Sequence, residues 1–322
     1  MPNDDATART VLAALHMDTA DLARLGSGFA SQVWLVRDAG LAYALRIALD
    51  PADRVCTFPA EHNLMARLGA LGARVPAPIA GSWQLDGWPL APFSLTSFIS
   101  GVPLRATAHP WAAGRIAAFL RLLHSIPATG FGPLIEVDGQ LRGQSGDMAA
   151  GLAATFAGDS LWPFGAARLT AHPALAERPE LQAGIEEQAH TVITAALDRP
   201  GVVVHSDLHE ENMLQDGRRI GFIDFGESFV GSADWDFAAL AYFGGWLLAE
   251  RTLAAYLPDE RDFERRRASI AAVALSFGLF RWQQDRRLGV DDEVHDESFL
   301  GESLARVQAP AAAVRTQATP GA

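Results

Sequence analysis

Residues 202–226 read VVVHSDLHEENMLQDGRRIGFIDFG, and this stretch decides the fold. The opening run of valines predicts a buried strand, and the Asp216-Gly217 pair predicts a turn into a second short strand over residues 220–223. Polar side chains lie between the two strands and directly after the second one. We expect this hairpin-like arrangement to bring three of them towards one place: Asp207, Asn212 and Asp224.

The chemistry of these three side chains points to phosphoryl transfer. A carboxylate that follows a strand, as Asp207 does, can accept the proton of a hydroxyl nucleophile. The amide oxygen of Asn212 and the carboxylate of Asp224 are hard oxygen ligands of the kind that Mg²⁺ takes beside water and phosphate. Moving a phosphoryl group onto an alcohol needs this set, because positioning and charge neutralisation supply most of the catalysis.

The spacing of these residues forms a recognisable motif, H-[GS]-D-x-x-x-x-N followed by D-x-G. Here it stands as His205-Ser206-Asp207 with Asn212, and then Asp224-Phe225-Gly226. This resembles the aminoglycoside phosphotransferase family and its relatives, the choline, homoserine and macrolide kinases. The resemblance spans most of residues 20–290. It implies a two-lobed α+β fold of the protein-kinase type, with a small antiparallel-sheet N-lobe and a mainly helical C-lobe.

Two other interpretations of the polar cluster stay open. An Asp or Asn in a loop often serves only as a turn or cap residue. A zinc site could also form from His205, Asp207 and His209, since His and carboxylate side chains spaced by two can ligate Zn²⁺. In the sequence, no further His or Cys cluster nearby completes such a shell.

The composition is that of an ordinary globular protein with an acidic balance of charge. The chain has 322 residues, of which 49% are apolar and 20% are charged, and its formal net charge is −12. The negative charge argues against a nucleic-acid partner, which would need a basic surface, and it is compatible with a cationic substrate. The composition leaves the oligomeric state open.

Three features lead us to expect a cytoplasmic protein without a membrane segment. The single cysteine, Cys56, allows no internal disulfide. The start of the chain lacks the basic and apolar regions of a signal peptide. The longest apolar stretch, residues 237–249, is too short and too interrupted by glycine to span a bilayer.

A Gly/Ser turn near the N-terminus is the first expected contact to a nucleotide. It contains Ser27, Gly28 and Ser31 and leads into a predicted strand. Small residues let backbone N–H groups approach phosphate oxygens closely, which is the use of such a loop in kinases. The position of the turn, ahead of the other elements, favours this function over an ordinary hairpin.

A basic strand residue and an acidic helix residue form the second expected contact. The strand over residues 43–47 carries Arg46 where the family that this chain resembles normally presents a lysine. An arginine can neutralise the same phosphates, although with a different geometry. Glu61 lies in a helix expected over residues 58–71 and is similar to the helix glutamate that pairs with this basic residue.

The strand over residues 93–101 is similar to the family's hinge segment, whose backbone holds the nucleobase. By that resemblance Ser97, Phe98 and Ile99 would line the base, and both ATP and GTP stay open as donors. The domain limits follow from this hinge: an N-terminal nucleotide-binding lobe over 1–97, a C-terminal catalytic and substrate-binding lobe over 98–308, and a disordered tail over 309–322.

The rest of the chain is expected to be mainly helical. Apolar periodicity predicts helices over residues 111–126, 174–198 and 262–287. Residues 128–172 show no lasting periodicity, which predicts an irregular segment such as a lid or a substrate loop.

The resemblance implies the remaining roles. His205 and Asp236 would support the catalytic loop, and Asp236 would do so by accepting hydrogen bonds from the loop backbone at a helix start. Three acidic side chains are candidate contacts to a cationic substrate: Glu210, Glu227 and Asp285.

Together these features predict a kinase that transfers the γ-phosphoryl group of ATP or GTP to a hydroxyl of a small molecule, with Mg²⁺ as cofactor. An aminoglycoside or a similar hydroxylated antibiotic is the first expectation, while choline, homoserine, a sugar and a macrolide stay open. A catalytically silent nucleotide-binding protein of the same fold is a further alternative. Only the replacement of the usual lysine by Arg46 supports it.

Overall fold

The computed structural model describes residues 4–27, 31–49, 57–106, 109–155, 161–165, 169, 175–176, 178–257, 259, 262–289 and 293–309. The chain divides into two compact units, each drawn from several segments. Unit 1 comprises residues 1–102, 135–141 and 214–226, and unit 2 comprises residues 103–134, 142–213 and 227–322. The domain limits expected from the hinge stay a prediction, and the two units are described separately.

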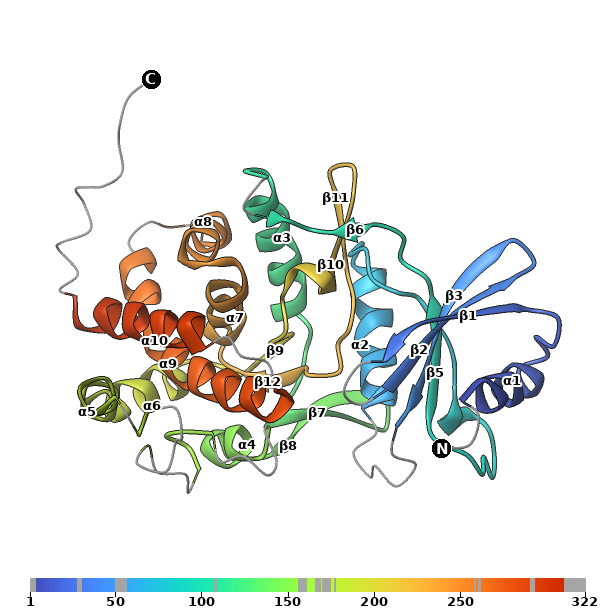
Figure 1. Ribbon diagram of the computed structural model, residues 1–322, viewed down its shortest axis with the longest axis horizontal. Coiled ribbons are helices and arrows are strands. Elements are labelled where there is room, and N and C mark those ends of the chain that lie inside the picture. The colour runs from blue at the N-terminus through green and yellow to red at the C-terminus, as the bar shows by residue number, and fades with distance from the viewer. Residues whose placement is uncertain are drawn as a thin grey trace. The chain divides into compact units, whose positions relative to one another are not determined.

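Unit 1 is built on a five-stranded antiparallel sheet (Figure 1) in the order β1-β2-β3-β5-β4. Its strands are β1 (Asp21–Ser27), β2 (Ser31–Asp38), β3 (Leu41–Ala48), β4 (Pro78–Gly81) and β5 (Phe93–Ser97). Its helices are α1 (Asp4–Ala14), α2 (Phe58–Ala70) and the short η1 (Ser82–Gln84).

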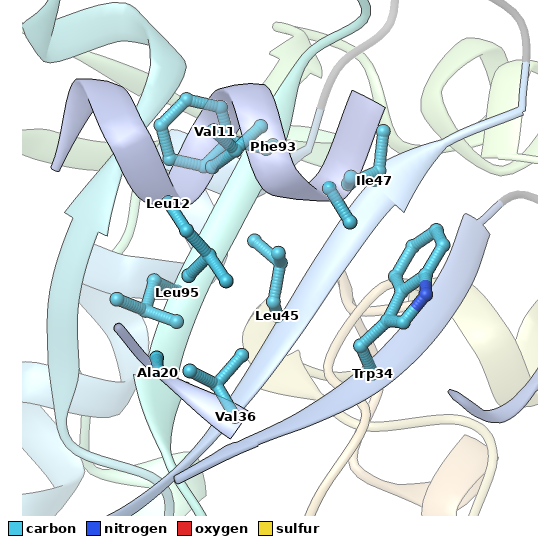
Figure 2. Close-up of a cluster of buried hydrophobic side chains, with 10 residues drawn as sticks. Val11, Leu12, Ala20, Trp34, Val36, Leu45, Ile47, Phe93 and Leu95 are labelled. Atoms are coloured by element: carbon cyan, nitrogen blue, oxygen red, sulfur yellow. The ribbon is translucent and has the colours of Figure 1, made fainter. Parts of the chain in front are cut away.

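The core of unit 1 lies between the sheet and α1. Val11 and Leu12 of α1 pack on apolar side chains of β2, β3 and β5 (Figure 2), Trp34, Leu45 and Phe93 among them. Side chains alternate between the two faces of a strand, so the face of β3 opposite this core is left for Arg46, which lies between Leu45 and Ile47. The hydrophobic pattern of one strand therefore sets the direction of its basic residue.

The turn expected at Asp216-Gly217 is present, but the hairpin-like arrangement expected between residues 202–204 and 220–223 is wrong, because the two segments lie in different sheets. The turn instead joins two other neighbours, β10 (Met213–Asp216) and β11 (Arg219–Phe222), and β6 (Val102–Pro103) adds to β10 to complete a three-stranded sheet. Gly217 has a φ of 61°, in the left-handed region that the tight turn requires. Asn212 directly precedes β10 and Asp224 follows β11.

Unit 2 is mainly helical. Its helices are α3 (Ala112–His124), α4 (Met148–Thr155), α5 (Pro179–Glu187), α6 (Ala189–Leu197), α7 (Asp234–Gly244), α8 (Trp246–Tyr256), α9 (Phe263–Leu288), α10 (Glu293–Gln308) and the short η5 (Glu210–Asn212). The long helix α9 packs against α6, α7 and α10, and its Trp282 is fully buried in a cluster with Leu300 of α10. Among the helices described, none is long and apolar enough to cross a membrane.

A four-stranded sheet in the order β8-β7-β12-β9 accompanies these helices. Its strands are β7 (Phe131–Val137), β8 (Gln140–Ser145), β9 (Val202–Val204) and β12 (Phe229–Gly231). The tip of the β7–β8 hairpin, residues 135–141, is assigned to unit 1. Strand β9 is the buried valine run, and its end leads into the His205-Ser206-Asp207 motif.

Two predictions for this part of the chain are wrong. Residues 128–172 are not an irregular segment throughout, because β7, β8 and α4 lie within them. Their glycines have a packing function, since a Cβ on Gly143 would lie 2.3 Å from the backbone of Phe131. The helix expected over 174–198 is instead two helices, α5 and α6, which meet at Gln188.

Candidate functional site

Arg46 is the centre of a charged cluster in unit 1. Its Nη1 atom donates to Oε2 of Glu61 at 2.5 Å, and its Nη2 atom lies 3.3 Å from Oδ1 of Asp224. The guanidinium also lies over the ring of Phe58, 5.2 Å from the ring centroid. A strand, a helix and the segment after β11 therefore each supply one charged member of the cluster.

Glu61 is held in place from both sides. Its side chain is 3% exposed, and its second oxygen, Oε1, accepts a hydrogen bond of 2.6 Å from the hydroxyl of Thr57 at the start of α2. A carboxylate so buried requires such partners, because an unpaired buried charge is strongly unfavourable. Both of its oxygens are thus engaged, one of them by Arg46.

A buried histidine ties the helix of Glu61 to the strand that pairs with Arg46. Nε2 of His62 lies 2.7 Å from Oγ of Ser94, and Ser94 is the residue of β5 directly opposite Arg46. Burial, together with the nearby charge of Arg46, lowers the pKa of His62 to about 4, so the ring is neutral near pH 7. This contact fixes α2 against the sheet beside the charged cluster.

The backbone at Asp224 is held in an uncommon conformation. Its φ is 59°, in the left-handed region, and half of its side chain is exposed. Such a conformation is unfavourable for a residue with a side chain and is found most often at functional positions. The carboxylate keeps Oδ1 towards Arg46 and retains access to solvent.

The structure describes two of the three residues expected in the phosphate-binding turn. Ser27 pairs with Gln32 across β1 and β2, and the hydroxyl of buried Ser31 accepts a hydrogen bond of 3.4 Å from Nε of Arg46. Gly28 lies outside the described residues. Ser31 is thereby connected to the charged cluster.

The expected hinge residues begin at Ser97, the last residue of β5, and continue beyond it. The N–H of Ser97 donates to the carbonyl of Ala77, and the N–H of Phe98 donates to that of Ala42. Both donors are used within unit 1, and recognition of a base by these residues stays a prediction. The side chain of Ile99 packs closely on Gly221 of β11.

Asp207 and Asn212 lie together in unit 2. The side-chain amide of Asn212 donates to Oδ2 of Asp207 and to its backbone carbonyl, each at 2.9 Å. Nε2 of His209 lies 3.4 Å from the same Oδ2 atom. The other carboxylate oxygen, Oδ1, has Arg281 of α9 as its charged neighbour, with Nη1 at 4.0 Å. Oδ2 is therefore occupied, while Oδ1 has no hydrogen bond from the residues that the structure describes.

The surroundings of Asp207 keep it ionised at neutral pH. Burial alone would raise its pKa, but the hydrogen bond and charge of His209, with further contributions from His205 and Arg281, bring the pKa below its usual range. For His209, burial would lower the pKa, and the carboxylate of Asp207 raises it overall. Both shifts describe a mutual attraction of carboxylate and imidazolium.

Asp236 holds the loop that carries Asp207. The fully buried carboxylate accepts through Oδ1 from the backbone N–H groups of His205, at 3.0 Å, and Ser206, at 2.8 Å. Its Oδ2 atom lies 2.9 Å from Nε2 of His124, whose other ring nitrogen contacts the hydroxyl of Tyr256. Ser206 has a φ of 63°, so the loop turns through a left-handed residue directly before Asp207. His205 is itself fully buried.

The three acidic residues expected to contact a substrate differ in exposure. Glu210 and Glu227 are exposed, whereas Asp285 is 9% exposed. Oδ2 of Asp285 accepts from the hydroxyl of Tyr242 at 2.9 Å, and its Oδ1 atom lies 3.7 Å from Nη2 of Arg281. The carboxylate of Asp285 thus already has a cation of this chain beside it.

Sequence reasoning missed Arg281 as a neighbour of Asp207, because the two residues lie 74 positions apart (281 − 207) and no motif connects them. One signal was present: Arg281 and Asp285 are spaced i,i+4 on a predicted helix, which places both on one face. His209 was weighed only as a zinc ligand, and its role as the partner of Asp207 was not anticipated.

The donor set fits Mg²⁺ better than Zn²⁺. Asn212 uses its NH₂ group on Asp207, which leaves the amide carbonyl oxygen for a cation, and Asp224 offers a half-exposed carboxylate. Both are hard oxygen donors. Within the part of the chain that the structure describes, no group of three or more His, Cys, Asp or Glu side chains is arranged to hold a metal, so the zinc alternative gains no support.

The three residues expected to converge are thus described in two groups. Asp207 and Asn212 are in contact within unit 2, and Asp224 joins Arg46 and Glu61 within unit 1. Each group presents one part of the chemistry: a carboxylate with an open oxygen in unit 2, and a paired arginine with an accessible carboxylate in unit 1.

A family model described as "Phosphotransferase enzyme family" (APH) matches residues 21–269. Among solved structures, a thermostable mutant of the aminoglycoside phosphotransferase APH(4)-Ia, in a ternary complex with AMP-PNP and hygromycin B, is 17% identical with a TM-score of 0.68. The alignment covers 94% of this chain and 99% of that one. No curated protein sequence matches the chain significantly.

Two further solved structures share the fold. A choline/ethanolamine kinase family protein from Mesorhizobium loti is 21% identical, with a TM-score of 0.55 and coverage of 95% of each chain. The gentamicin complex of APH(2'')-IIa is 18% identical with a TM-score of 0.56, covering 97% of this chain and 98% of that one. These likenesses confirm the protein-kinase-like α+β fold class expected from the motif.

Proposed function

The chain belongs to the phosphotransferase enzyme family and is a phosphotransferase with a hydroxyl group as acceptor, and from this premise we propose its donor, acceptor and site residues. It transfers the γ-phosphoryl group of ATP or GTP to a hydroxyl of an aminoglycoside or a similar hydroxylated antibiotic. The observation that carries the proposal is the carboxylate of Asp207, with Oδ2 fixed by Asn212 and Oδ1 open.

Asp207 is the catalytic residue of the proposal. Its open Oδ1 atom receives the acceptor hydroxyl, orients the hydroxyl oxygen towards the phosphorus, and takes the proton as the new O–P bond forms. The lowered pKa supports this role, because the carboxylate is ionised and ready to accept a hydrogen bond at neutral pH. Asp236 and His205 keep the loop in position.

The phosphates of the donor are assigned to the cluster around Arg46. The guanidinium, oriented by Glu61, neutralises the α- and β-phosphates, and the turn at Ser27, Gly28 and Ser31 covers them. Asn212 and Asp224 would hold Mg²⁺, which supplies charge neutralisation to the phosphate oxygens when bound. Ser97, Phe98 and Ile99 line the base.

The choice of an antibiotic acceptor rests on three supports. Two of the structures that share the fold are complexes with hygromycin B and with gentamicin, at 17% and 18% identity. The net charge of −12 favours a cationic ligand. Exposed Glu210 and Glu227 are the proposed cation contacts, and Asp285 acts on the acceptor through Arg281. Such an activity would confer antibiotic resistance and belongs in the cytoplasm, where the nucleotide donor is found.

A kinase of another small alcohol is the second candidate, because one structural neighbour is a choline/ethanolamine kinase family protein. Choline, homoserine, sugars and macrolides therefore belong in the same test. A catalytically silent protein of this fold is the third candidate. Turnover distinguishes it from the antibiotic kinase and from the kinase of another small alcohol.

The test is nucleotide consumption by the purified protein with Mg²⁺. ATP and GTP are each paired with aminoglycosides, macrolides, choline and homoserine, and Asp207→Ala serves as the catalytic control. We expect turnover that depends on one acceptor class and falls by about 10²–10⁴-fold in Asp207→Ala, with the variant still folded. Mg²⁺-dependent nucleotide binding without turnover would favour a silent protein. Absence of both nucleotide binding and turnover would overturn the assignment.

A further inference from the structure

Arg281 lies beside the proposed catalytic carboxylate and has no assigned contact of its own with the acceptor. Its Nη1 atom is 4.0 Å from Oδ1 of Asp207, and its Nη2 atom is 3.7 Å from Oδ1 of Asp285. Both distances allow charge attraction, but both exceed the 2.7–3.2 Å that N–H···O hydrogen bonds span. The guanidinium therefore sits between two carboxylates and is hydrogen-bonded to neither of them.

Aromatic rings hold the guanidinium in this place. Its central carbon lies 5.0 Å from the ring centroid of Phe243 and 5.9 Å from that of Tyr242. The hydroxyl of Tyr242 lies 2.9 Å from Oδ2 of Asp285 and 2.5 Å from Oδ1 of Asp296 and shares its single proton between them, so the same residue contacts both the arginine and its acidic neighbour. A planar cation stacked in this way loses little further freedom when a ligand binds.

The donors of Arg281 are incompletely satisfied. Its Nε atom is buried and has no hydrogen-bond partner among the described residues, and about a quarter of the side chain, 26%, is exposed. Buried donors are nearly always paired in folded proteins. A guanidinium has five N–H groups arranged as a fork that fits two neighbouring oxygen atoms. Nε is closed off, and the Nη1 and Nη2 groups, which are hydrogen-bonded to neither carboxylate, are the donors that an oxygen-bearing ligand would satisfy.

We propose that Arg281 is a specificity-determining residue that donates hydrogen bonds to an oxygen of the acceptor next to the hydroxyl that reacts at Asp207. The inference rests on the proposed function and deepens it by naming the acceptor class. The acceptor carries an oxygen substituent on the carbon neighbouring the reacting hydroxyl, as in a vicinal diol. An ammonium group at that carbon is rejected, because it would face the positive charge of Arg281.

The position of the two carboxylates supports this choice. Asp207 and Asp285 would attract a substrate ammonium if they stood alone, but Arg281 already lies within 4.0 Å of both. The guanidinium of Arg281 thus occupies the place next to Asp207 where a substrate ammonium would bind. Amino groups elsewhere on the acceptor can still contact Glu210 and Glu227, which are exposed.

The first test uses whichever acceptor of the panel is turned over. Arg281→Gln removes the charge and the fork, Arg281→Lys keeps the charge alone, and Arg286→Gln changes an exposed arginine on the same helix as the matched control. We expect Arg281→Gln to lower kcat/KM by about 10- to 100-fold, mostly through KM, with Arg281→Lys in between and Arg286→Gln within about twofold of the parent. Circular dichroism and thermal unfolding establish that each variant is folded.

The second test compares acceptors that differ by one substituent, with the unmodified enzyme and with Arg281→Gln. D-glucose is paired with D-glucosamine, and kanamycin A with kanamycin B, the second member of each pair having an amine in place of a hydroxyl. We expect the unmodified enzyme to prefer the hydroxyl member and Arg281→Gln to lose that preference.

The outcomes separate the two proposals. Choline or the amine members as preferred acceptors, or an Arg281→Gln variant within about threefold of the parent in kcat/KM, overturn the role of Arg281 and leave the kinase assignment intact. Absence of turnover with every acceptor overturns the proposed function and this inference with it.

Discussion

Ser206 occupies a backbone conformation that suits glycine better than serine. Its φ of 63° lies in the left-handed region, while its N–H donates to Asp236 and its hydroxyl donates to the carbonyl of Glu227 at 2.8 Å. The motif accepts Gly or Ser at this position, and the geometry explains why. Glycine tolerates the left-handed conformation, and serine offsets the cost of that conformation with the hydrogen bond of its hydroxyl.

Two substitutions at this position separate the backbone cost from the hydrogen bond. Ser206→Gly and Ser206→Ala both remove the hydroxyl, but only glycine relieves the left-handed strain. We expect Ser206→Gly to be more stable than Ser206→Ala by about 1 kcal/mol, measured by urea unfolding. Equal free energies of unfolding for the two variants would contradict the strain at this residue.

His62 gives the stability of the protein a defined pH dependence. Its pKa in the folded protein is about 4, below the value of 6.5 for an exposed histidine, so the unfolded chain takes up the proton first as the pH falls. Its contribution to stability is complete above about pH 6.5 and is lost progressively towards pH 4, by about 3 kcal/mol in total.

The variant His62→Gln isolates this effect from other titrating groups. Glutamine can still reach Ser94 but does not titrate. We expect the difference in unfolding free energy between parent and variant to shrink as the pH falls from 6.5 to 4, because only the parent loses stability through this site. Parallel curves over that range would show that the histidine is not buried in neutral form.

At the scale of the element, close approach explains where glycine is required within helices. A Cβ on Gly278 of α9 would lie 2.8 Å from Cδ1 of Phe299 and 3.0 Å from Cδ2 of Leu300, both on α10. Gly69 of α2 is exposed and has no atom within 4 Å of such a Cβ. Close packing therefore decides the effect of replacing Gly278 in α9, whereas helix propensity decides the effect of replacing Gly69 in α2.

Alanine at these two positions should have opposite effects on stability. Gly278→Ala is expected to destabilise by about 1–3 kcal/mol, because the methyl group displaces α10, while Gly69→Ala stabilises by about 0.5–1 kcal/mol through helix propensity. Thermal unfolding of the two variants beside the parent checks both signs. Stabilisation by both would mean that α9 and α10 are packed less closely than described.

Elements with a strong local signal could be predicted, and those that depend on distant partners could not. The valine run of β9, the strand with Arg46 and the helix with Glu61 form where periodicity places them. Strand β7 was missed because its glycines resemble those of a loop and because one of its two pairing partners, β12, lies 96 residues away (229 − 133). Likewise, the contact of Arg281 with Asp207 depends on how α9 packs, which no local pattern encodes.

For the whole molecule, metal dependence is the clearest prediction. Along the chain, the proposed ligand Asn212 precedes β10 and the proposed ligand Asp224 follows β11, and neither provides a complete site by itself. We expect EDTA to abolish turnover and added Mg²⁺ to restore it, and Asn212→Ala to raise the Mg²⁺ concentration needed for half-maximal activity. Full activity in EDTA after extensive dialysis would exclude this ligand assignment.

The assembly of unit 1 from separated segments also matters while the chain is being made. The five strands of its sheet are complete at residue 97, yet Asp224, the partner of Arg46, is added 127 residues later (224 − 97). At ordinary rates of translation that interval lasts roughly 6 to 25 s. A growing chain on the ribosome can thus fold its sheet early and pair Arg46 with Glu61, but it has neither Asp207 nor Asp224 until about two-thirds of the protein has been synthesised. Nascent chains would therefore be unable to consume nucleotide before their own synthesis is well advanced.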